Sequence, residues 1–128
     1  MDILQLPPTK RDNKYLFVLV DMLTRYAVAV SLKGKSATQV ASALKQFVLH
    51  DRLLGAPALI VSDNGLEFAN QTMTRLFKRY GTKQIFTTPY NPKANGSTER
   101  LNRTLLSLLR GLLTPDIEWD SVLPLLWI

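Results

Sequence analysis

The sequence has 128 residues, a hydrophobic share of 46% and a net charge of +6, with 16 Lys and Arg against 10 Asp and Glu. This length favours one domain, the hydrophobic share suffices for a buried core, and the charge favours an anionic partner such as nucleic acid. The absence of cysteine excludes disulfides and thiolate metal sites. The early apolar run 16–20 is far too short to span a bilayer, and no signal-peptide pattern opens the chain.

The first part of the chain predicts three strands. A short apolar stretch over 2–6 is closed by two prolines. Residues 15–21, "YLFVLVD", are rich in aromatic and β-branched side chains and predict a buried strand. Residues 26–32 predict another strand, and the short link before them favours an antiparallel hairpin.

A helix and a fourth strand follow. Ser36 has the character of an N-cap, and the apolar residues behind it recur at helical spacing, which predicts an amphipathic helix over 37–50. Gly55 and Pro57 interrupt the pattern. The apolar residues at 58–62 then predict a strand.

The remainder predicts a helix over 70–80, a strand over 83–88, an irregular loop over 89–98 and a long last helix. The loop prediction depends on the Asn, Gly and Pro residues of "PYNPKANGST". From Thr98 onward, leucines line one face of the last helix. The order of elements predicts an α/β fold with a mixed sheet, in which a hairpin comes first and βαβ crossovers follow.

Asp63 ends the fourth predicted strand, inside "IVSDNGLEF". One interpretation is a turn, because Asp and Asn close turns with their own side chains and Gly65 accepts a positive φ. The other is that Asp63 is half of a metal site, which requires partners elsewhere in the chain.

Glu99 lies near the start of the last helix, on a different face from the leucines. It can simply complement the helix dipole, or it can face Asp63 across the sheet. The 89–98 loop has the composition to approach a phosphate backbone, and Arg100, Arg103 and Arg110 follow on the helix. A carboxylate surrounded by cations suits a groove that metal ions and phosphates share.

The spacing and the flanking residues resemble a known family. Between Asp63 and Glu99 lie 35 residues, with "SDNGLEF" around the first and "TPYNPKANGSTERLNR" around the second. This pattern resembles the catalytic core of retroviral and LTR-retrotransposon integrases, especially those of gypsy-type elements. The resemblance runs from "MDILQLPP" to "WDSVLPLLW", over essentially the whole chain. It implies a ribonuclease H-like fold, with a central five-stranded mixed sheet flanked by helices.

The family uses three acidic residues, and the resemblance places the second and third at Asp63 and Glu99. Two residues are candidates for the first. Asp2 matches the family's pattern of an acid on the first strand before a proline-containing link and is preferred, while Asp21 closes the second predicted strand. The resemblance implies that a further set of residues borders DNA, namely Asn64, Tyr90, Lys93, Asn95, Asn102 and Arg103.

The implied reaction is two-metal phosphoryl transfer on DNA, with Asp2, Asp63 and Glu99 holding two Mg²⁺ or Mn²⁺ ions. It comprises 3′-end processing and strand transfer into target DNA. The implied partners are double-stranded DNA and further copies of the chain, as a homodimer or higher oligomer, with no membrane. The implied location is the nucleus, reached from the cytoplasm in a pre-integration particle. Residues 1–128 are then a single core domain truncated at both ends, without the family's zinc-binding and C-terminal DNA-binding domains.

Three alternatives remain open. The chain can be a non-catalytic, domesticated or fragmentary module that binds DNA or protein. It can be another nuclease of the same fold, although the Pro-Tyr-Asn-Pro loop and the 35-residue spacing disfavour this. It can also be an oligomerisation unit, because "SVLPLLWI" would expose apolar surface.

Overall fold

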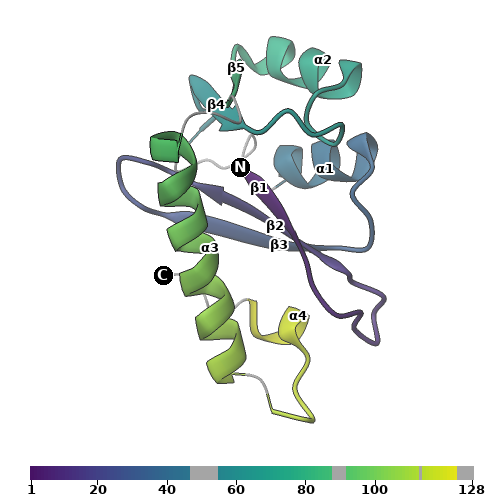
Figure 1. The fold of residues 1–128 in the computed structure, drawn as a ribbon. Coiled ribbons are helices and arrows are strands. Elements are labelled where there is room, and N and C mark those ends of the chain that lie inside the picture. The colour runs from purple at the N-terminus through teal and green to yellow at the C-terminus, as the bar shows by residue number, and fades with distance from the viewer. Residues whose placement is uncertain (47–54, 88–91, 113, 124–128) are drawn as a thin grey trace.

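The computed structural model describes residues 1–46, 55–87, 92–112 and 114–123. Within these ranges nine elements follow one another (Figure 1). In order they are β1 (Asp2–Gln5), β2 (Tyr15–Val20), β3 (Ala27–Leu32), α1 (Ala37–Leu44), β4 (Leu59–Ser62), α2 (Gln71–Tyr80), β5 (Lys83–Phe86), α3 (Pro92–Leu112) and α4 (Trp119–Val122). None of the helices in these ranges has the length and apolar content needed to cross a membrane.

The first three strands form an antiparallel sheet in the order β1-β2-β3, which confirms the predicted hairpin. Strand β2 is central and has both faces covered, because successive side chains of a strand point to opposite sides. Phe17 points into a cluster with α1 and α2. Leu16 and Val18 point into a second cluster with α3 and α4. The sheet is therefore the middle of three layers.

Strands β4 and β5 are parallel and are connected through α2, a βαβ unit of the kind that the sequence predicts. Helix α2 begins where the Asn70 side chain accepts a hydrogen bond from the Met73 amide at 2.9 Å. It ends at Gly81, whose φ of 69° is the left-handed conformation that glycine adopts without a steric cost. Met73 and Phe77 are buried and fix the helix against α1 and β5.

The expected single five-stranded sheet is not confirmed, because the described strands form separate three-stranded and two-stranded ladders. The Met1 amino group donates to the Val61 carbonyl at 2.7 Å, which joins the start of β1 to β4. In the alternating ladder between β1 and β2, the Ile3 amide points away from β2. It donates to Oδ1 of Asp2 at 2.8 Å instead of to β4. Among the described residues, the hydrogen bond from Met1 to Val61 is therefore not continued by the Ile3 amide.

The predicted loop over 89–98 is wrong for residues 92–98, because α3 begins at Pro92. Proline is favoured at the first helical position, where its fixed φ suits the helix and its missing N–H would have had no partner. Gly96 costs a helix interior about 1 kcal/mol relative to alanine, which the packing of the rest of α3 offsets. Residues 47–50 of the predicted first helix lie outside the described part of the chain.

Helix α4 is attached to the loop between β1 and β2. The Trp119 indole donates to the Pro7 carbonyl at 2.7 Å. Oδ2 of Asp120 accepts hydrogen bonds from the Thr9 hydroxyl at 2.9 Å and from the Asn13 amide at 2.7 Å. The Asp120 side chain is only 1% exposed, and Arg11 lies 3.7 Å from its Oδ1. These hydrogen bonds hold α4 against the β1–β2 loop, in the layer that also contains α3.

Candidate functional site

Asp2 is the first residue of β1 and is half-buried. Its two oxygens have different partners. Oδ1 accepts from the Ile3 amide at 2.8 Å, and Oδ2 accepts from Nδ2 of Asn102 at 2.6 Å. A carboxylate with two donors is held in one orientation at the edge of the sheet, where it is available to a ligand.

Asn102 lies on α3 and is 8% exposed. Its hydrogen bond to Asp2 joins the last long helix to the first strand, 100 residues away in the sequence. Its Oδ1 is buried and has no hydrogen-bond partner among the described residues. The structure therefore gives Asn102 a contact with Asp2, which the sequence did not indicate, and an unsatisfied oxygen next to it.

Asp63 is exposed and directly follows β4. Its Oδ1 accepts from the Gly65 amide at 2.9 Å, which confirms that this side chain closes a turn. The positive φ expected at Gly65 is wrong, because among the described glycines only Gly55 and Gly81 have one. A Cβ on residue 65 would lie 3.0 Å from that oxygen and 2.9 Å from the Glu67 carboxyl carbon, so glycine allows the turn to close. The turn holds the carboxylate at the end of the strand and leaves its charge exposed.

Asp2 and Asp63 lie close enough to act on the same group. Burial lowers the pKa of the Met1 amino group, and the negative charges of Asp2 and Asp63 both oppose that shift in its pKa. The amino group donates to the carbonyl of Val61, two residues before Asp63. The structure thus brings the first two predicted acids to the junction of β1 and β4.

Glu99 lies on α3, three residues before Asn102, and positions three apart share one face of a helix. Its side chain is 66% exposed, and its carboxylate lies 4.0 Å from the Arg103 guanidinium, which is 78% exposed. An exposed pair of this kind is worth about 0.3–0.5 kcal/mol. Glu99 is therefore near the Asp2–Asn102 contact along the helix, and little holds it in its present rotamer.

The donor chemistry fits a hard divalent cation. The candidate ligands are carboxylate oxygens, which Mg²⁺ and Mn²⁺ prefer, and the unpartnered Asn102 oxygen adds a polar atom next to Asp2. Within the described ranges, however, no three acidic, histidine or cysteine side chains lie close enough together to hold a metal. Glu99 is the residue whose side chain would have to turn to complete such a group, because its carboxylate now lies 4.0 Å from Arg103.

The other residues predicted to border DNA lie in the turn after β4, on α3 and outside the described part of the structure. Asn64 is exposed in the turn after β4, and Arg103 is exposed on α3. Lys93 and Asn95 lie in the first turns of α3, but their side chains are outside the described part of the structure. Tyr90 lies outside it entirely. Contact of these residues with DNA stays a prediction.

Asp21 is the other candidate for the first acid, and both oxygens of its carboxylate accept hydrogen bonds within the turn between β2 and β3. Its Oδ2 accepts from the Thr24 hydroxyl at 2.7 Å and its Oδ1 from the Leu23 amide at 3.0 Å. The hydrogen bonds from Thr24 and Leu23 lower the pKa of Asp21. The turn continues through Arg25, which has a φ of 65°. These contacts favour a structural role for Asp21 and leave Asp2 as the preferred first acid.

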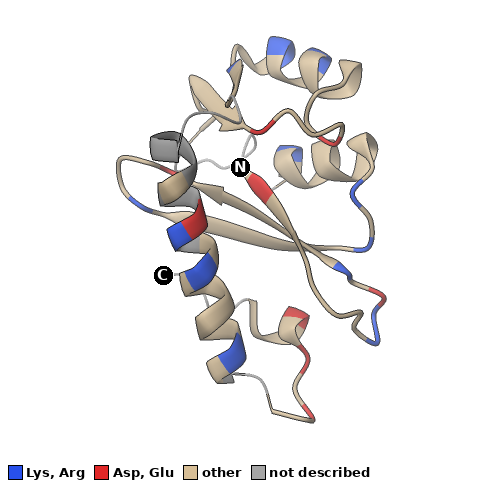
Figure 2. Ribbon diagram, viewed as in Figure 1, with Lys and Arg blue, Asp and Glu red and all other residues tan. Residues whose placement is uncertain are grey.

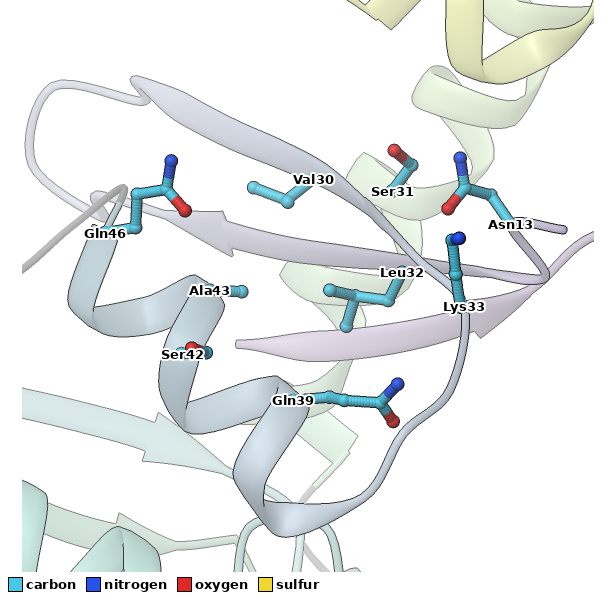
Figure 3. A pocket seen from close by; sticks show the side chains of 9 residues that line it. All are labelled: Asn13, Val30, Ser31, Leu32, Lys33, Gln39, Ser42, Ala43 and Gln46. Carbon is cyan, nitrogen blue, oxygen red and sulfur yellow. The ribbon is translucent and has the colours of Figure 1, made fainter. Parts of the chain in front are cut away.

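A hollow of about 310 Å³ lies between β3 and α1 (Figure 3). Neutral polar and apolar side chains line it together with Lys33, and Figure 3 shows Gln39 and Gln46 on the α1 side. None of the three predicted acids lines this hollow. It therefore has no part in the candidate site.

The chain matches known proteins along most of its length. Residues 1–92 match the family described as the integrase core domain. Over 117 residues the chain is 33% identical to the retrovirus-related Pol polyprotein from transposon 412 of Drosophila melanogaster, covering 90% of this chain and 9% of that protein. It is 30% identical over 127 residues to the Gag-Pol polyprotein of gibbon ape leukemia virus, covering 98% of this chain and 7% of that protein. The chain thus spans less than a tenth of these relatives.

Solved structures resemble the fold. One is the intasome of simian T-cell lymphotropic virus in complex with PP2A regulatory subunit B56 gamma, with a TM-score of 0.83 and 28% identity over 97% of this chain and 44% of that chain. Another is the HTLV-2 integrase catalytic core domain in complex with magnesium, in a trimeric form. It has a TM-score of 0.76 and 25% identity over 96% of this chain and 76% of that chain. The described elements are thus those of a ribonuclease H-like integrase core.

The family match ends at residue 92, so it includes Asp2 and Asp63 and stops before Glu99. It extends over more than half of the 128 residues. The chain therefore belongs to the integrase core domain family, whose general function is DNA integration.

Proposed function

We propose that this chain is the catalytic core that transfers phosphoryl groups of DNA, first trimming the 3′ ends of an element and then joining them to target DNA. The observation that supports this most is the hydrogen bond from the Met1 amino group to the Val61 carbonyl at 2.7 Å. It joins the residue before Asp2 to the residue two positions before Asp63, although the two acids are about sixty residues apart in the sequence. Asn102 adds the link from Asp2 to the helix that bears Glu99.

In this proposal Asp2, Asp63 and Glu99 hold the divalent ions. Two Mg²⁺ or Mn²⁺ ions, when bound, supply Lewis acidity to the attacking and leaving oxygens. The hydrogen bond from Asn102 fixes the Asp2 carboxylate, and the Gly65 amide fixes that of Asp63. The reaction is an in-line attack on phosphorus, by water in end processing and by the new 3′-hydroxyl in strand transfer. In each step the P–O3′ bond of the attacked phosphodiester breaks and a 3′-hydroxyl leaves.

The other predicted residues position the nucleic acid. Arg103 offers a guanidinium that can bind a phosphate bidentately, and turning Glu99 toward Asp2 would release it from its 4.0 Å contact. Asn64 lies beside Asp63 and can donate an amide to the same DNA. Lys93, Tyr90 and Asn95 are proposed to border the DNA end. The proposal includes assembly with further copies of the chain and action in the nucleus.

The second candidate is a non-catalytic module that binds DNA or protein. One observation favours it: among the residues that the structure describes, no three acidic side chains are close enough to hold a metal. If the chain is a catalytic core, Asp2 is needed for the reaction. If it is a binding module, Asp2 is needed only for the hydrogen bonds that it accepts from Ile3 and Asn102.

An assay of strand transfer and of its reversal on branched duplex oligonucleotides with Mn²⁺ tests this. We expect wild-type activity and its loss in Asp2→Asn, with Asp21→Asn within about threefold of wild type, because Asp21 contacts only its own turn. The reverse order would identify Asp21 as the first acid. An inactive wild type that still binds DNA would favour the module.

The pH dependence of stability separates the structural role of Asp21 from any catalytic one. Its pKa is below the usual value of 3.8, so the ionised form stabilises the fold above that pH, and this contribution is lost as the pH falls through the lowered pKa. Asp21→Asn should therefore be less stable than wild type at neutral pH, and the difference should shrink in acid. Thermal unfolding at several pH values measures it.

A further inference from the structure

The exposed face of α2 carries a group of cations that the proposed active site does not use. Arg75, Lys78 and Arg79 are all exposed, and no acidic residue lies on the helix. This one element contributes +3 of the net charge of +6. Figure 2 shows blue and no red along α2.

The geometry of the helix directs these three side chains away from the core. Met73 and Phe77 are buried, and Leu76 and Tyr80 pack against the same cluster. At 100° per residue, the directions of Arg75, Lys78 and Arg79 centre on the opposite side of the helix. Residues three and four apart lie about 5–6 Å from one another, so the cations form one compact patch, called here the α2 basic face.

Within the described ranges, these cations have no counter-charges in contact with them. No described acidic side chain lies within 4.0 Å of Arg75, Lys78 or Arg79, whereas Arg103 on α3 has Glu99 at that distance. Lys78 and Arg79 also complement the dipole in the last turn of the helix. Arg75, a turn earlier, does not, and Lys83 extends the positive charge to the start of β5.

The chemistry of the face favours a polyphosphate over an apolar partner. The other exposed residues of α2 are the neutral hydrogen-bonding side chains of Gln71, Thr72 and Thr74. None of the exposed large hydrophobic residues of the described structure lies on this helix. Protein-interface hot spots and helices that lie in a membrane surface use apolar anchors, whereas a DNA backbone is bound by Lys, Arg and neutral donors.

The face is also directed away from the core that joins α2 to the candidate site. Helix α3, with Glu99 and Asn102, packs in the cluster around Leu16 and Val18, on the other side of the sheet from α2. Strand β4, which precedes Asp63, belongs to the same βαβ unit as α2, but the three cations lie on the side of the helix opposite the buried residues that face this unit. We propose that the α2 basic face binds the backbone of duplex DNA at a second surface, distinct from the one where the acids act. This rests on the proposed function only in taking DNA as the polyanion.

The test compares two triple variants that each remove three positive charges. One is Arg75→Gln, Lys78→Gln and Arg79→Gln, which keeps good helix formers on α2. The matched control is Lys10→Gln, Arg25→Gln and Lys33→Gln, three exposed cations outside that helix. Circular dichroism and thermal unfolding establish that both variants fold as the wild type does.

Fluorescence anisotropy with a labelled 30-base-pair duplex, measured in EDTA from about 50 to 300 mM salt, reports binding without any chemistry. Each lost phosphate contact lowers the slope of log affinity against log salt by about 0.9. We expect the α2 variant to bind more than about 10-fold more weakly and to lose about 2 to 3 slope units. The control should stay within about threefold and lose less than 1.

Equal losses in both variants would mean that net charge alone governs binding and would overturn the proposal, as would an unchanged α2 variant. Wild-type binding to an acidic peptide but not to duplex DNA would also overturn it. Because the assay contains no divalent metal, failure of the catalytic proposal would appear as activity in acid-site variants and would leave these binding results unaffected.

Discussion

Replacement of Asp63 by asparagine is expected to abolish Mn²⁺-dependent strand transfer while leaving the fold intact. The turn after β4 needs only the acceptor Oδ1, which accepts from the Gly65 amide at 2.9 Å, and asparagine provides the same acceptor. The substitution therefore removes the negative charge and little else. Loss of a group that only orients a metal ligand costs about 10–100-fold, so loss of a direct ligand should cost more than about 100-fold.

Glu99→Gln should have the same effect for the same reason. The Glu99 side chain is 66% exposed, and its one described ion pair is the 4.0 Å contact with Arg103, so the variant should keep the wild-type stability to within about 0.5 kcal/mol. Asp116→Asn, at an exposed acid outside the site, is the matched control and should keep full activity. Activity of either site variant within about threefold of wild type would refute the assigned site.

Replacement of Asp120 by alanine is expected to be the most destabilising single change among the polar residues of the described structure. The carboxylate accepts from Thr9 and Asn13 and is 1% exposed. Hydrogen bonds to a charged group contribute about 1.5–3 kcal/mol each, and part is regained when water reaches the donors. We expect a loss of about 3 kcal/mol in the free energy of unfolding, or roughly 10 °C in Tm.

Chemical denaturation measures this, with Asp116→Ala as the exposed control. Thr9→Val alone should cost about 1–2 kcal/mol, and its effect should be largely lost in the Asp120→Ala background, because both variants break the same hydrogen bond. Additive effects, or an Asp120→Ala variant as stable as the control, would show that the attachment of α4 to the β1–β2 loop contributes little.

Local chemistry is what the sequence predicted best. Ser36 caps α1 with a full capping box to Gln39, as its type and position indicated. All five strands form near their predicted positions because their runs of β-branched and aromatic residues are strong signals. The exception is 92–98, where proline and glycine suggested a loop and helix propagation prevailed from Pro92 onward.

Contacts between distant segments could not be predicted in the same way. The hydrogen bond from Asn102 to Asp2 spans 100 residues and that from Thr9 to Asp120 spans 111. No periodic pattern in the sequence predicts either hydrogen bond, because each depends on how the layers pack against one another. Asn102 had one usable clue, its position three residues after Glu99 on a helix. The hydrogen bond from the Ile3 amide to Oδ1 of Asp2 depends on the rotamer of Asp2, which no spacing encodes.

The central claim is that Asp2, Asp63 and Glu99 form one ion-binding group, and a Mn²⁺ soak of crystals tests it most directly. We expect two anomalous peaks about 3.5–4 Å apart, with oxygens of these three residues at coordination distance and Glu99 turned away from Arg103. Manganese bound elsewhere, or Glu99 still paired with Arg103 while Asp2 and Asp63 remain free of metal, would contradict it.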